Sequence, residues 1–321
     1  MAAGLGTRLR PLTYEIPKPL VPVANRPIME HILALLARHD LGEVIANLHF
    51  FPETIRDRFG DGSRVGIELT YRYEEELLGT AGGVRNVREF FGDRQFVVMA
   101  ADALTDIDLG ALARAHAERD WIATLAVKRV ANVSEYGVVV TGADGRVQGF
   151  QEKPAQAEAL SDLASCMIYV LEPEIFDYFP ERDAVDFALE VFPALLEHDV
   201  PFGVHVIDDY WNDVGSVPEY LQGNLDVLAG AVDVEPAGEL LDADAGGTLG
   251  DGIEVTGRVL VGEGAQIGDG ARLDGPVVVG PGATVGAGAR VRESLLLPRA
   301  EVPVDGLLAG AIAGRRGTLS D

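Results

Sequence analysis

The chain opens with the stretch Met1–Pro22, MAAGLGTRLRPLTYEIPKPLVP, from which we interpret the rest of the sequence. Its first six residues carry little side-chain bulk, and their glycines let backbone N–H groups come close to an anionic ligand. Arg8 and Arg10 follow directly, and a forked guanidinium suits phosphate oxygens. Lysine then stands between two prolines at 17–19, which restrict the local backbone. The stretch therefore predicts a phosphate-binding loop.

Composition places the chain among globular proteins with a substantial core. Its 321 residues suggest one large or two medium domains, and the hydrophobic share is 47% with a mean hydropathy of +0.13. Apolar runs stay well short of the roughly 20 residues that span a bilayer, and the N-terminus lacks a signal-peptide pattern. The single cysteine, Cys166, excludes internal disulfides, so we expect a cytoplasmic protein.

The charge balance excludes whole classes of partner. The formal net charge is -25, whereas nucleic acids and anionic membranes both require basic protein surface. Phosphate ligands must therefore find a locally basic pocket within an acidic protein. We expect small-molecule substrates, with no nucleic acid and no membrane as partners.

Strand and helix patterns alternate through the first part of the chain. This alternation predicts an α/β fold, with a Rossmann-like mixed, mainly parallel sheet and helices on both faces. The expected strands cover 44–49, 67–73, 96–101 and 123–128, and the expected helices begin near 27 and cover 52–59, 80–91 and 109–119.

Shorter strand spacing follows, over 136–141, 147–151 and 166–171, and predicts an antiparallel insertion beside the main sheet. Helices are expected at 173–178 and 185–197, a strand at 202–207 and a closing helix at 216–228. We therefore place a first domain at 1–228 and a Gly-, Asp- and Ala-rich linker at 229–248.

The hydrophobic period then changes to six. Nine aliphatic residues recur at this spacing from Leu249 to Leu297, and glycine directly follows several of them. Such hexapeptide repeats predict a left-handed parallel β-helix, with one aliphatic side chain pointing inward from each face. We assign it to 249–312 and expect the polar segment 313–321 to be a loose tail.

The string G-x-G-T-R-L-x-P-L-T followed by P-K-P resembles the signature of the sugar-nucleotide pyrophosphorylases. The resemblance implies an enzyme that forms an NDP-sugar and pyrophosphate from a nucleoside triphosphate and a sugar 1-phosphate. The L-G-T-A-G loop at 78–82 is most similar to the mannose-1-phosphate guanylyltransferase branch, some of whose members carry a C-terminal hexapeptide domain. GTP and mannose 1-phosphate are therefore the expected substrates, and a uridylyl- or thymidylyl-transferring enzyme acting on glucose 1-phosphate or a related sugar is the alternative.

The same resemblance implies roles for particular residues. Arg8 and Lys18 would be catalytic, and the nucleotide would contact Ala3, Gly4, Gly6, Thr7, Gly79, Thr80 and Gly82. In the 78–82 loop, backbone groups and the threonine hydroxyl would discriminate the nucleobase. Taken without the resemblance, this loop is a helix start with small residues for packing.

Two further motifs imply a sugar-phosphate site. Glu152-Lys153-Pro154 resembles the family's E-K-P motif, whose Glu contacts sugar hydroxyls and whose Lys contacts the phosphate, and the backbone of Gly137 would approach the sugar. Ser165-Cys166-Met167 departs from the family, which usually has Asn-x-Gly there. We expect this methionine at the wall of the sugar pocket, where it bears on which sugar is accepted.

Two carboxylates are candidate Mg²⁺ ligands. Asp102 follows a buried apolar strand, and a carboxylate at the carboxyl end of a parallel strand lies at the ligand-binding crevice. Taken by position alone, Asp102 is slightly better explained as a turn residue or a helix N-cap. Asp213 lies in Trp211-Asn212-Asp213-Val214-Gly215, which resembles the W-x-D-x-G motif that supplies the second metal ligand. Ala101 departs from the Gly that usually precedes the first aspartate.

Two other classes of function are weighed against the enzyme. A non-catalytic regulatory paralogue would bind sugar nucleotides but tends to lose the phosphate lysine or a metal aspartate, and this chain keeps both. An acyltransferase in the β-helix would commonly use a histidine base, and all six histidines precede the repeats. We therefore expect the β-helix to mediate homo-oligomer assembly.

In this family a short apolar strand precedes the glycine loop, whereas Met1 here stands directly before Ala2-Ala3-Gly4. A sheet without that central strand would bury unpaired backbone groups. We therefore expect the natural product to extend upstream with an apolar, β-branched segment.

Overall fold

The computed structural model describes residues 1–242, 252–315 and 317–319. The chain divides into two compact units. Unit 1 is Met1–Leu5, Leu33–Asp102 and Ile107–Trp211, and unit 2 is Gly6–Ile32, Ala103–Asp106 and Asn212–Asp321. This division cuts the predicted phosphate loop after Leu5. The domain boundary expected near residue 228 stays a prediction.

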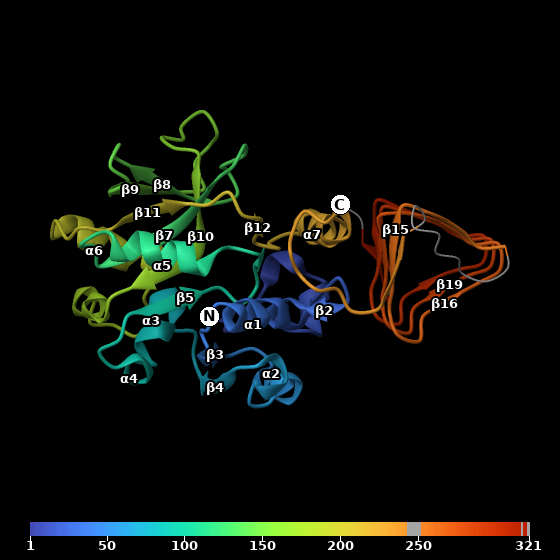
Figure 1. Cartoon of the computed structure of the whole chain (residues 1–321), viewed down its shortest axis with the longest axis horizontal. Coiled ribbons are helices and arrows are strands. Elements are labelled where there is room, and N and C mark those ends of the chain that lie inside the picture. Colours follow the sequence, from blue (N-terminus) through green and yellow to red (C-terminus); the bar gives the residue numbers. More distant parts are fainter. Residues whose placement is uncertain (243–251, 316, 320–321) are drawn as a thin grey trace. The chain divides into compact units, whose positions relative to one another are not determined.

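A six-stranded sheet forms the centre of unit 1 (Figure 1). Its order is β11-β7-β10-β8-β9, and β5 also pairs with β10. The apolar run near residue 96 and the β-branched run near 123 supply buried strands, as expected for a sheet covered on both faces. The strands are β5 (Phe96–Met99), β7 (Ala123–Arg129), β8 (Gly137–Thr141), β9 (Val147–Glu152), β10 (Leu163–Leu171) and β11 (Gly203–Val206).

The sheet is mixed, as predicted, but the expectation that it is mainly parallel is wrong. Strand β10 runs antiparallel to β5, β7 and β8, and β8 runs antiparallel to β9. Parallel pairing within unit 1 joins β7 to β11, and joins β3 (Glu43–Leu48) to β4 (Glu68–Tyr73) in a separate sheet. The nine-residue strand β10 returns between β5 and β7. The alternation of strands and helices along the sequence does not predict this antiparallel position of β10.

Helices cover this sheet and define its core. Helix α5 packs against β7 and β10, and α6 packs against β9. The Phe192 ring at the start of α6 stacks on Phe150 and Phe202, with centroid distances of 5.5 and 5.7 Å. The helices of unit 1 are α2 (Pro52–Phe59), α3 (Gly79–Arg85), α4 (Arg88–Phe91), α5 (Leu109–Ala117) and α6 (Phe192–Glu197), with a 3₁₀ segment at Pro173–Tyr178.

Two expected helices are interrupted. The segment 80–91 divides into α3 and α4, and 185–197 divides into a π-helical turn, η6 (Phe187–Val191), followed by α6. Asp186 caps η6, because its side chain accepts hydrogen bonds from the backbone N–H groups of Ala188 and Leu189. Pro193 is the second residue of α6 and directly follows the π-helical turn.

Unit 2 contains short turns, one long helix and the repeat domain. Helix α7 (Val217–Ala229) begins with Ser216, whose hydroxyl accepts from the backbone N–H of Glu219, and ends at Gly230 with φ +75°. It packs against β1 (Pro22–Val23), β15 and β18. The other short elements are η1 (Thr7–Leu9), η2 (Leu12–Tyr14), η3 (Lys18–Leu20), β2 (Arg26–Pro27), β6 (Leu104–Thr105) and β12 (Trp211–Asn212), and α1 covers Ile28–Arg38.

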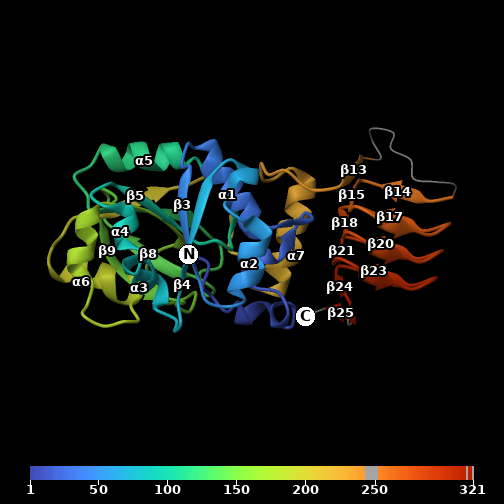
Figure 2. The same ribbon diagram turned by 90° about the horizontal axis from the view of Figure 1, so that it is seen from below.

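The repeats form a coil of parallel strands with three faces (Figures 1 and 2). Val255 pairs with Leu273, and Leu273 pairs with Val291, so one turn of the coil takes 18 residues, or three hexapeptides. The strands are β14 (Glu254–Thr256), β15 (Arg258–Val261), β16 (Gln266–Ile267), β17 (Arg272–Asp274), β18 (Val277–Val279), β19 (Thr284–Val285), β20 (Arg290–Arg292), β21 (Leu295–Leu296), β22 (Glu301–Val302), β23 (Leu307–Ala309) and β24 (Ile312–Gly314).

The six-residue register does not extend to Leu297. Val279 pairs with Leu296, and Val285 pairs with Val302, so this turn of the coil takes 17 residues. Leu296 is fully buried, whereas Leu297 is only partly buried against the core. The expectation that Leu297 is the inward residue of its repeat is therefore wrong. The first residue of the series, Leu249, lies outside the described residues.

Antiparallel strands pair with both edges of one coil face (Figure 2). Strand β13 (Glu239–Asp242), in the expected linker, pairs with β15, and β25 (Gly317–Leu319), in the expected tail, pairs with β24. These segments are thus ordered where the sequence predicted irregular chain, and they cover backbone groups that would otherwise be open to other strands. Residues 243–251, 316, 320 and 321 lie outside the described part.

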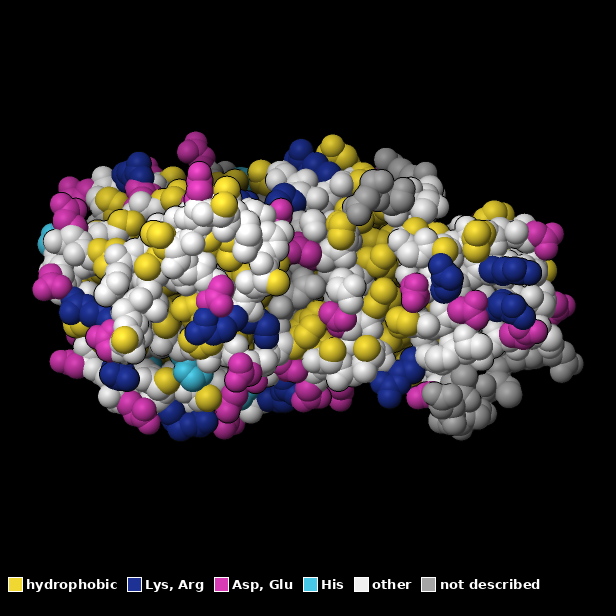
Figure 3. Space-filling view, turned by 90° about the horizontal axis from the view of Figure 1, so that it is seen from above, with side chains coloured by type: hydrophobic (Ala, Val, Ile, Leu, Met, Phe, Trp, Pro, Cys, Tyr) yellow, Lys and Arg dark blue, Asp and Glu magenta, His cyan; other side chains and the backbone are white. Residues whose placement is uncertain are grey.

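The surface carries side chains of both charges. Figure 3 shows acidic side chains interspersed with Lys and Arg across the face in view. Among the described residues, no helix combines the length and apolar character needed to cross a membrane.

His31 in α1 makes the stability of the fold depend on pH. Its side chain is 5% exposed, and Nε2 lies 3.0 Å from the Val23 carbonyl oxygen, which an imidazole N–H satisfies. Burial lowers the pKa of His31 below its ordinary value of 6.5. The unfolded chain therefore binds a proton more readily than the folded one, and the unfolding free energy should fall as pH drops from 6.5 toward the lowered pKa.

Urea denaturation at pH values from about 5 to about 8 measures this effect. The variant His31→Gln should flatten the dependence below 6.5, whereas His198→Gln, at an exposed site, should leave it unchanged. Equal slopes for the unchanged protein and His31→Gln would contradict the assignment.

Candidate functional site

The predicted catalytic cations meet the predicted metal ligand Asp213 within unit 2. Arg8 Nη2 lies 3.3 Å from Asp213 Oδ2, and Lys18 Nζ donates to the Asp213 carbonyl oxygen at 2.9 Å. The Lys18 residue is 7% exposed. A Cβ at Gly215 would lie 2.5 Å from both Arg8 Nη1 and Asp213 Oδ2, so this glycine leaves room for the ion pair.

Gly6 is required by the way its loop folds. Its φ is +61°, and a Cβ there would lie 2.9 Å from Lys18 Cβ and 3.1 Å from Thr13 Cγ2. The Thr13 hydroxyl donates to the Gly6 carbonyl oxygen at 2.7 Å. Gly6 therefore lets the loop close over Lys18, which holds the lysine in place. Thr7, the next predicted nucleotide contact, is exposed at the start of η1.

Asp213 lies in an environment that suits a cation. Burial raises its pKa, the negative charge of Glu219 raises it further, and Lys18 and Arg8 act in the opposite direction. A nearby positive charge stabilises the ionised form of a carboxylate that is partly desolvated and lies beside a second carboxylate. Its oxygens are also ligands of the kind Mg²⁺ prefers, so Asp213 fits the implied metal. The other predicted ligand, Asp102, is half-buried in a turn after β5 in unit 1.

The start of the glycine loop is anchored in unit 1. The Met1 amino group donates to the Met99 carbonyl oxygen at 2.6 Å, and the Ala101 N–H donates to the Met1 carbonyl oxygen at 2.9 Å. Ala3 is buried, whereas Gly4 is exposed, and no described atom lies within 4 Å of a Cβ built at Gly4. The fold therefore leaves open space at Gly4, as a loop that receives a ligand must.

A buried carboxylate that the sequence analysis missed connects two of the predicted loops. Glu74 is 2% exposed and follows β4. Its Oε1 accepts from Asn47 Nδ2 at 2.7 Å, and its Oε2 accepts from the Leu78 N–H at 3.2 Å. Asn47 Oδ1 in turn accepts from the Ala2 N–H at 2.9 Å. Glu74 is the first of three consecutive glutamates, and nothing in the sequence distinguishes it from the exposed Glu75 and Glu76.

The 78–82 loop packs against the segment around Val185. The N–H groups of Ala81 and Gly82 donate to the Val185 carbonyl oxygen at 2.9 and 3.0 Å. Gly79 has φ +73°, and a Cβ there would lie 2.5 Å from that same oxygen. A Cβ at Gly82 would lie 2.6 Å from the Asp183 carbonyl oxygen. Both glycines are therefore required by packing, and their contact with a nucleobase stays a prediction.

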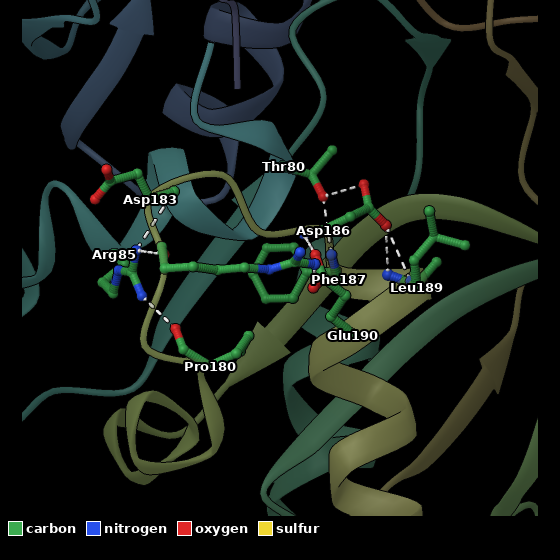
Figure 4. Close-up of polar contacts among 10 residues, drawn as sticks. Thr80, Arg85, Pro180, Asp183, Asp186, Phe187, Leu189 and Glu190 are labelled. Atoms are coloured by element: carbon green, nitrogen blue, oxygen red, sulfur yellow. Dashed lines mark hydrogen bonds and ion pairs between the residues drawn. The ribbon is translucent and has the colours of Figure 1, made fainter. Parts of the chain in front are cut away.

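Arg85 secures the far side of the same segment. Its guanidinium donates to the carbonyl oxygens of Pro180 at 2.8 Å and Asp183 at 3.2 Å, and also to that of Arg182 (Figure 4). Arg182 also forms an ion pair with Glu190 in η6. The Arg85 side chain thus ties the segment to α3, and the Arg182–Glu190 ion pair ties it to η6.

A cavity of about 350 Å³ in unit 1 contains two of the predicted sugar-site residues. Its polar side chains are those of Glu152, Gln151 and Ser165, and most of its wall is apolar. The remaining lining residues are Gly137, Phe150, Ala188, Leu189, Phe192, Pro193 and Leu196. Lys153, at φ +44°, is exposed at the end of β9, and its N–H donates to the Tyr136 carbonyl oxygen at 3.1 Å.

Trp211 lies beside the Tyr136 ring, with centroids 5.4 Å apart. It is buried, and its Nε1 has no hydrogen-bond partner among the described residues. A buried donor left in this way is suited to an acceptor that the protein itself does not supply.

Met167 does not line this cavity, and its expected place at the wall of the sugar pocket stays a prediction. Its side chain packs against the apolar core of unit 1, and Ser165, two residues earlier, faces the cavity instead. Met167 adopts φ +54°, a region that favours glycine, at an irregularity in the pairing of β10 with β7. The glycine expected at this position from the resemblance would relieve that backbone.

Sequence comparison gives an independent view of both halves of the chain. The family model described as nucleotidyl transferase matches residues 1–230, and the model of six bacterial transferase hexapeptide repeats matches residues 258–293. The UTP–glucose-1-phosphate uridylyltransferase of Synechocystis is 41% identical over 242 residues, which are 71% of this chain and 62% of that protein. The chain therefore spans less than two thirds of the length of that relative.

The mannose-1-phosphate guanylyltransferase of Mycobacterium tuberculosis is 34% identical over 272 residues, covering 83% of this chain and 75% of that protein. Among solved structures, HddC from Yersinia pseudotuberculosis superposes with a TM-score of 0.61 over 70% of this chain and 95% of its own. The identity in that superposition is 24%, so the likeness shows the fold alone.

Replacement of Glu74 tests whether its buried contacts are structural. In Glu74→Gln one carboxylate oxygen becomes an N–H₂ donor, which leaves the Asn47 amide or the Leu78 N–H without its acceptor. We expect the unfolding free energy to fall by about 1–3 kcal/mol. Urea denaturation measures this, with Glu76→Gln, at an exposed neighbour, as the matched control. Equal stabilities of the two variants would contradict the role given to Glu74.

Proposed function

The chain belongs to the nucleotidyl transferase family, and we propose on that basis that it is an enzyme joining a nucleoside triphosphate to a sugar 1-phosphate. The observation that carries the proposal is the match over residues 1–230 together with relatives whose names state this type of reaction. The structure supports it through the contacts of Arg8 and Lys18 with Asp213, and through the cavity beside Glu152.

In this reaction a phosphate oxygen of the sugar 1-phosphate attacks the α-phosphorus of the triphosphate, and pyrophosphate leaves. The attacking and leaving groups are anions, so catalysis depends mainly on positioning and on fixed positive charge. We assign Arg8 and Lys18 to the triphosphate, and Lys153 to the phosphate of the sugar. Lys18 is held by a backbone carbonyl oxygen and by the closure of Gly6 over it, so its charge is in place before substrate arrives.

The open space at Gly4, within a glycine loop, suits the phosphates of the nucleotide. Asp102 and Asp213 would hold Mg²⁺, which when bound neutralises charge on the phosphate being transferred. Glu152 would accept hydrogen bonds from sugar hydroxyls in the cavity, beside the Gly137 backbone.

Two substrate pairs are supported by different observations. The L-G-T-A-G loop and the Mycobacterium tuberculosis relative favour GTP with mannose 1-phosphate. The Synechocystis relative, at higher identity, favours UTP with glucose 1-phosphate. We retain GTP with mannose 1-phosphate as the proposal and UTP with glucose 1-phosphate as the second candidate.

The repeat domain is assigned to assembly. We propose that its coil is left-handed, as hexapeptide repeats favour, and that it forms a homo-oligomer contact. A cytoplasmic location remains the expectation from the single cysteine.

The purified protein with Mg²⁺, a panel of nucleoside triphosphates and a panel of sugar 1-phosphates tests the activity. Pyrophosphate release should appear with at least one pair, and with GTP and mannose 1-phosphate above the others. Preference for UTP and glucose 1-phosphate would select the second candidate. Release with no pair, from protein shown to be folded, would refute the proposed enzyme.

Variants of the two aspartates test the metal assignment. Asp102→Asn and Asp213→Asn should each remove most Mg²⁺-dependent turnover while the protein stays folded, because each loses a charged ligand. The loss should be on the order of several kcal/mol of transition-state stabilisation. Turnover and circular dichroism measure the two effects. If either variant keeps normal turnover at low Mg²⁺, that aspartate is not a ligand.

A further inference from the structure

The hydroxyl of Thr80 is already engaged within the protein. Its Oγ1 donates to Asp186 Oδ2 at 2.8 Å and accepts from the Phe187 N–H at 3.0 Å (Figure 4). A hydroxyl has one hydrogen to donate, and Asp186 takes it. The family resemblance gave this hydroxyl to the nucleobase, whereas its contacts belong to the segment that begins η6.

Asp186 uses its two carboxylate oxygens for different partners. While Oδ2 accepts from Thr80, Oδ1 accepts from the N–H groups of Ala188 and Leu189 at 2.8 and 3.1 Å (Figure 4). Its own N–H donates to Glu190 Oε2 at 2.9 Å. One side chain therefore caps η6 and also ties it to the 78–82 loop.

The residues capped in this way form part of the cavity wall. Ala188 and Leu189 line the cavity together with Gly137 and Glu152, which lie on strands β8 and β9. The wall across from Glu152 is thus built on a π-helical turn whose first N–H groups depend on Asp186. Thr80 does not line the cavity, yet it holds the carboxylate that orients this wall.

We propose that Thr80 and Asp186 are positioning residues for the sugar 1-phosphate, acting through the wall of the cavity. The proposal rests on the proposed function, because it takes the cavity beside Glu152 as the sugar site. It predicts that removing the Thr80 hydroxyl impairs use of the sugar 1-phosphate, although Thr80 lies in the loop assigned to the nucleotide.

The substitution Thr80→Val isolates the hydroxyl, because valine has the same shape without the oxygen. It leaves Asp186 Oδ2 and the Phe187 N–H without their partner, which loosens the start of η6. Thr80→Ser restores the hydroxyl. Thr70→Val makes the same change at an exposed threonine on β4, whose hydroxyl donates to the Val44 carbonyl oxygen at a long 3.4 Å, and serves as the matched control.

Steady-state pyrophosphate release at saturating triphosphate gives the first readout. Thr80→Val should raise the KM for the sugar 1-phosphate by about threefold to tenfold, the size of effect that the loss of one ordinary hydrogen bond produces. Thr80→Ser should return it to within about twofold of the unchanged protein, and Thr70→Val should not alter it. A change confined to the KM for the triphosphate or to base preference would show that Thr80 reads the base and would overturn the proposal.

A double-mutant cycle gives a second readout that needs no activity. The unfolding free energies of Thr80→Val, Asp186→Asn and the double variant should be non-additive, because both single changes break the same hydrogen bond. Additive effects would overturn the proposal even if no substrate pair were turned over. If the unfolding free energies are non-additive but the folded protein turns over no substrate pair, the contact between Thr80 and Asp186 is confirmed. Only the proposed function is then refuted.

Discussion

The carboxylate of Glu74 is the contact on which two loops of unit 1 depend, the glycine loop and the 78–82 loop. At 2% exposure it has no access to water, so each oxygen must be satisfied by a protein donor. Asn47 and the Leu78 N–H supply those donors, and Asn47 also accepts from the Ala2 N–H. One buried group thereby connects the start of the glycine loop to the start of the 78–82 loop. Neither loop can shift without leaving a buried polar atom unpaired.

The loops are then stiffened by contacts that a ligand does not provide. Val185 accepts from the N–H groups of Ala81 and Gly82, and Asp186 takes the Thr80 hydroxyl. In unit 2, the close packing of Gly6 against Lys18 likewise holds the lysine in place. The ion pair with Asp213 does the same for Arg8. Fixed charges and fixed loops suit a phosphoryl-type transfer, where reorganisation during the reaction would raise the barrier.

Much of the fold could be predicted from the sequence because its signals are local. Hydrophobic runs located the strands, and the six-residue spacing located the coil and its inward positions as far as Val291. The pairing direction of the strands was not predictable, because the position of β10 between β5 and β7 depends on tertiary packing. The one-residue change of register that buries Leu296 instead of Leu297 could not be predicted either, because both residues are leucines. The strands in the expected linker and tail arise from pairing with the edges of the coil: β13 pairs with β15, and β25 turns back onto the adjacent β24.

The residues of the candidate site were also predicted only in part. Arg8, Lys18 and Asp213 were found through motifs and lie together, as do Gly137 and Glu152 at the cavity. Glu74 was missed because its burial, and not its neighbours in sequence, sets it apart. Ser165 lines the cavity, whereas Met167, two residues later, packs against the core.

The central claim is that the 78–82 loop is ordered by protein contacts before any ligand binds. Hydrogen exchange of the ligand-free protein, followed by mass spectrometry on peptides spanning this loop, tests it most directly. The amide hydrogens of Leu78, Ala81 and Gly82 should exchange slowly, since each is bonded to Glu74 or Val185. Exchange at the rate of an unstructured peptide, slowing only when a nucleotide is added, would contradict the account.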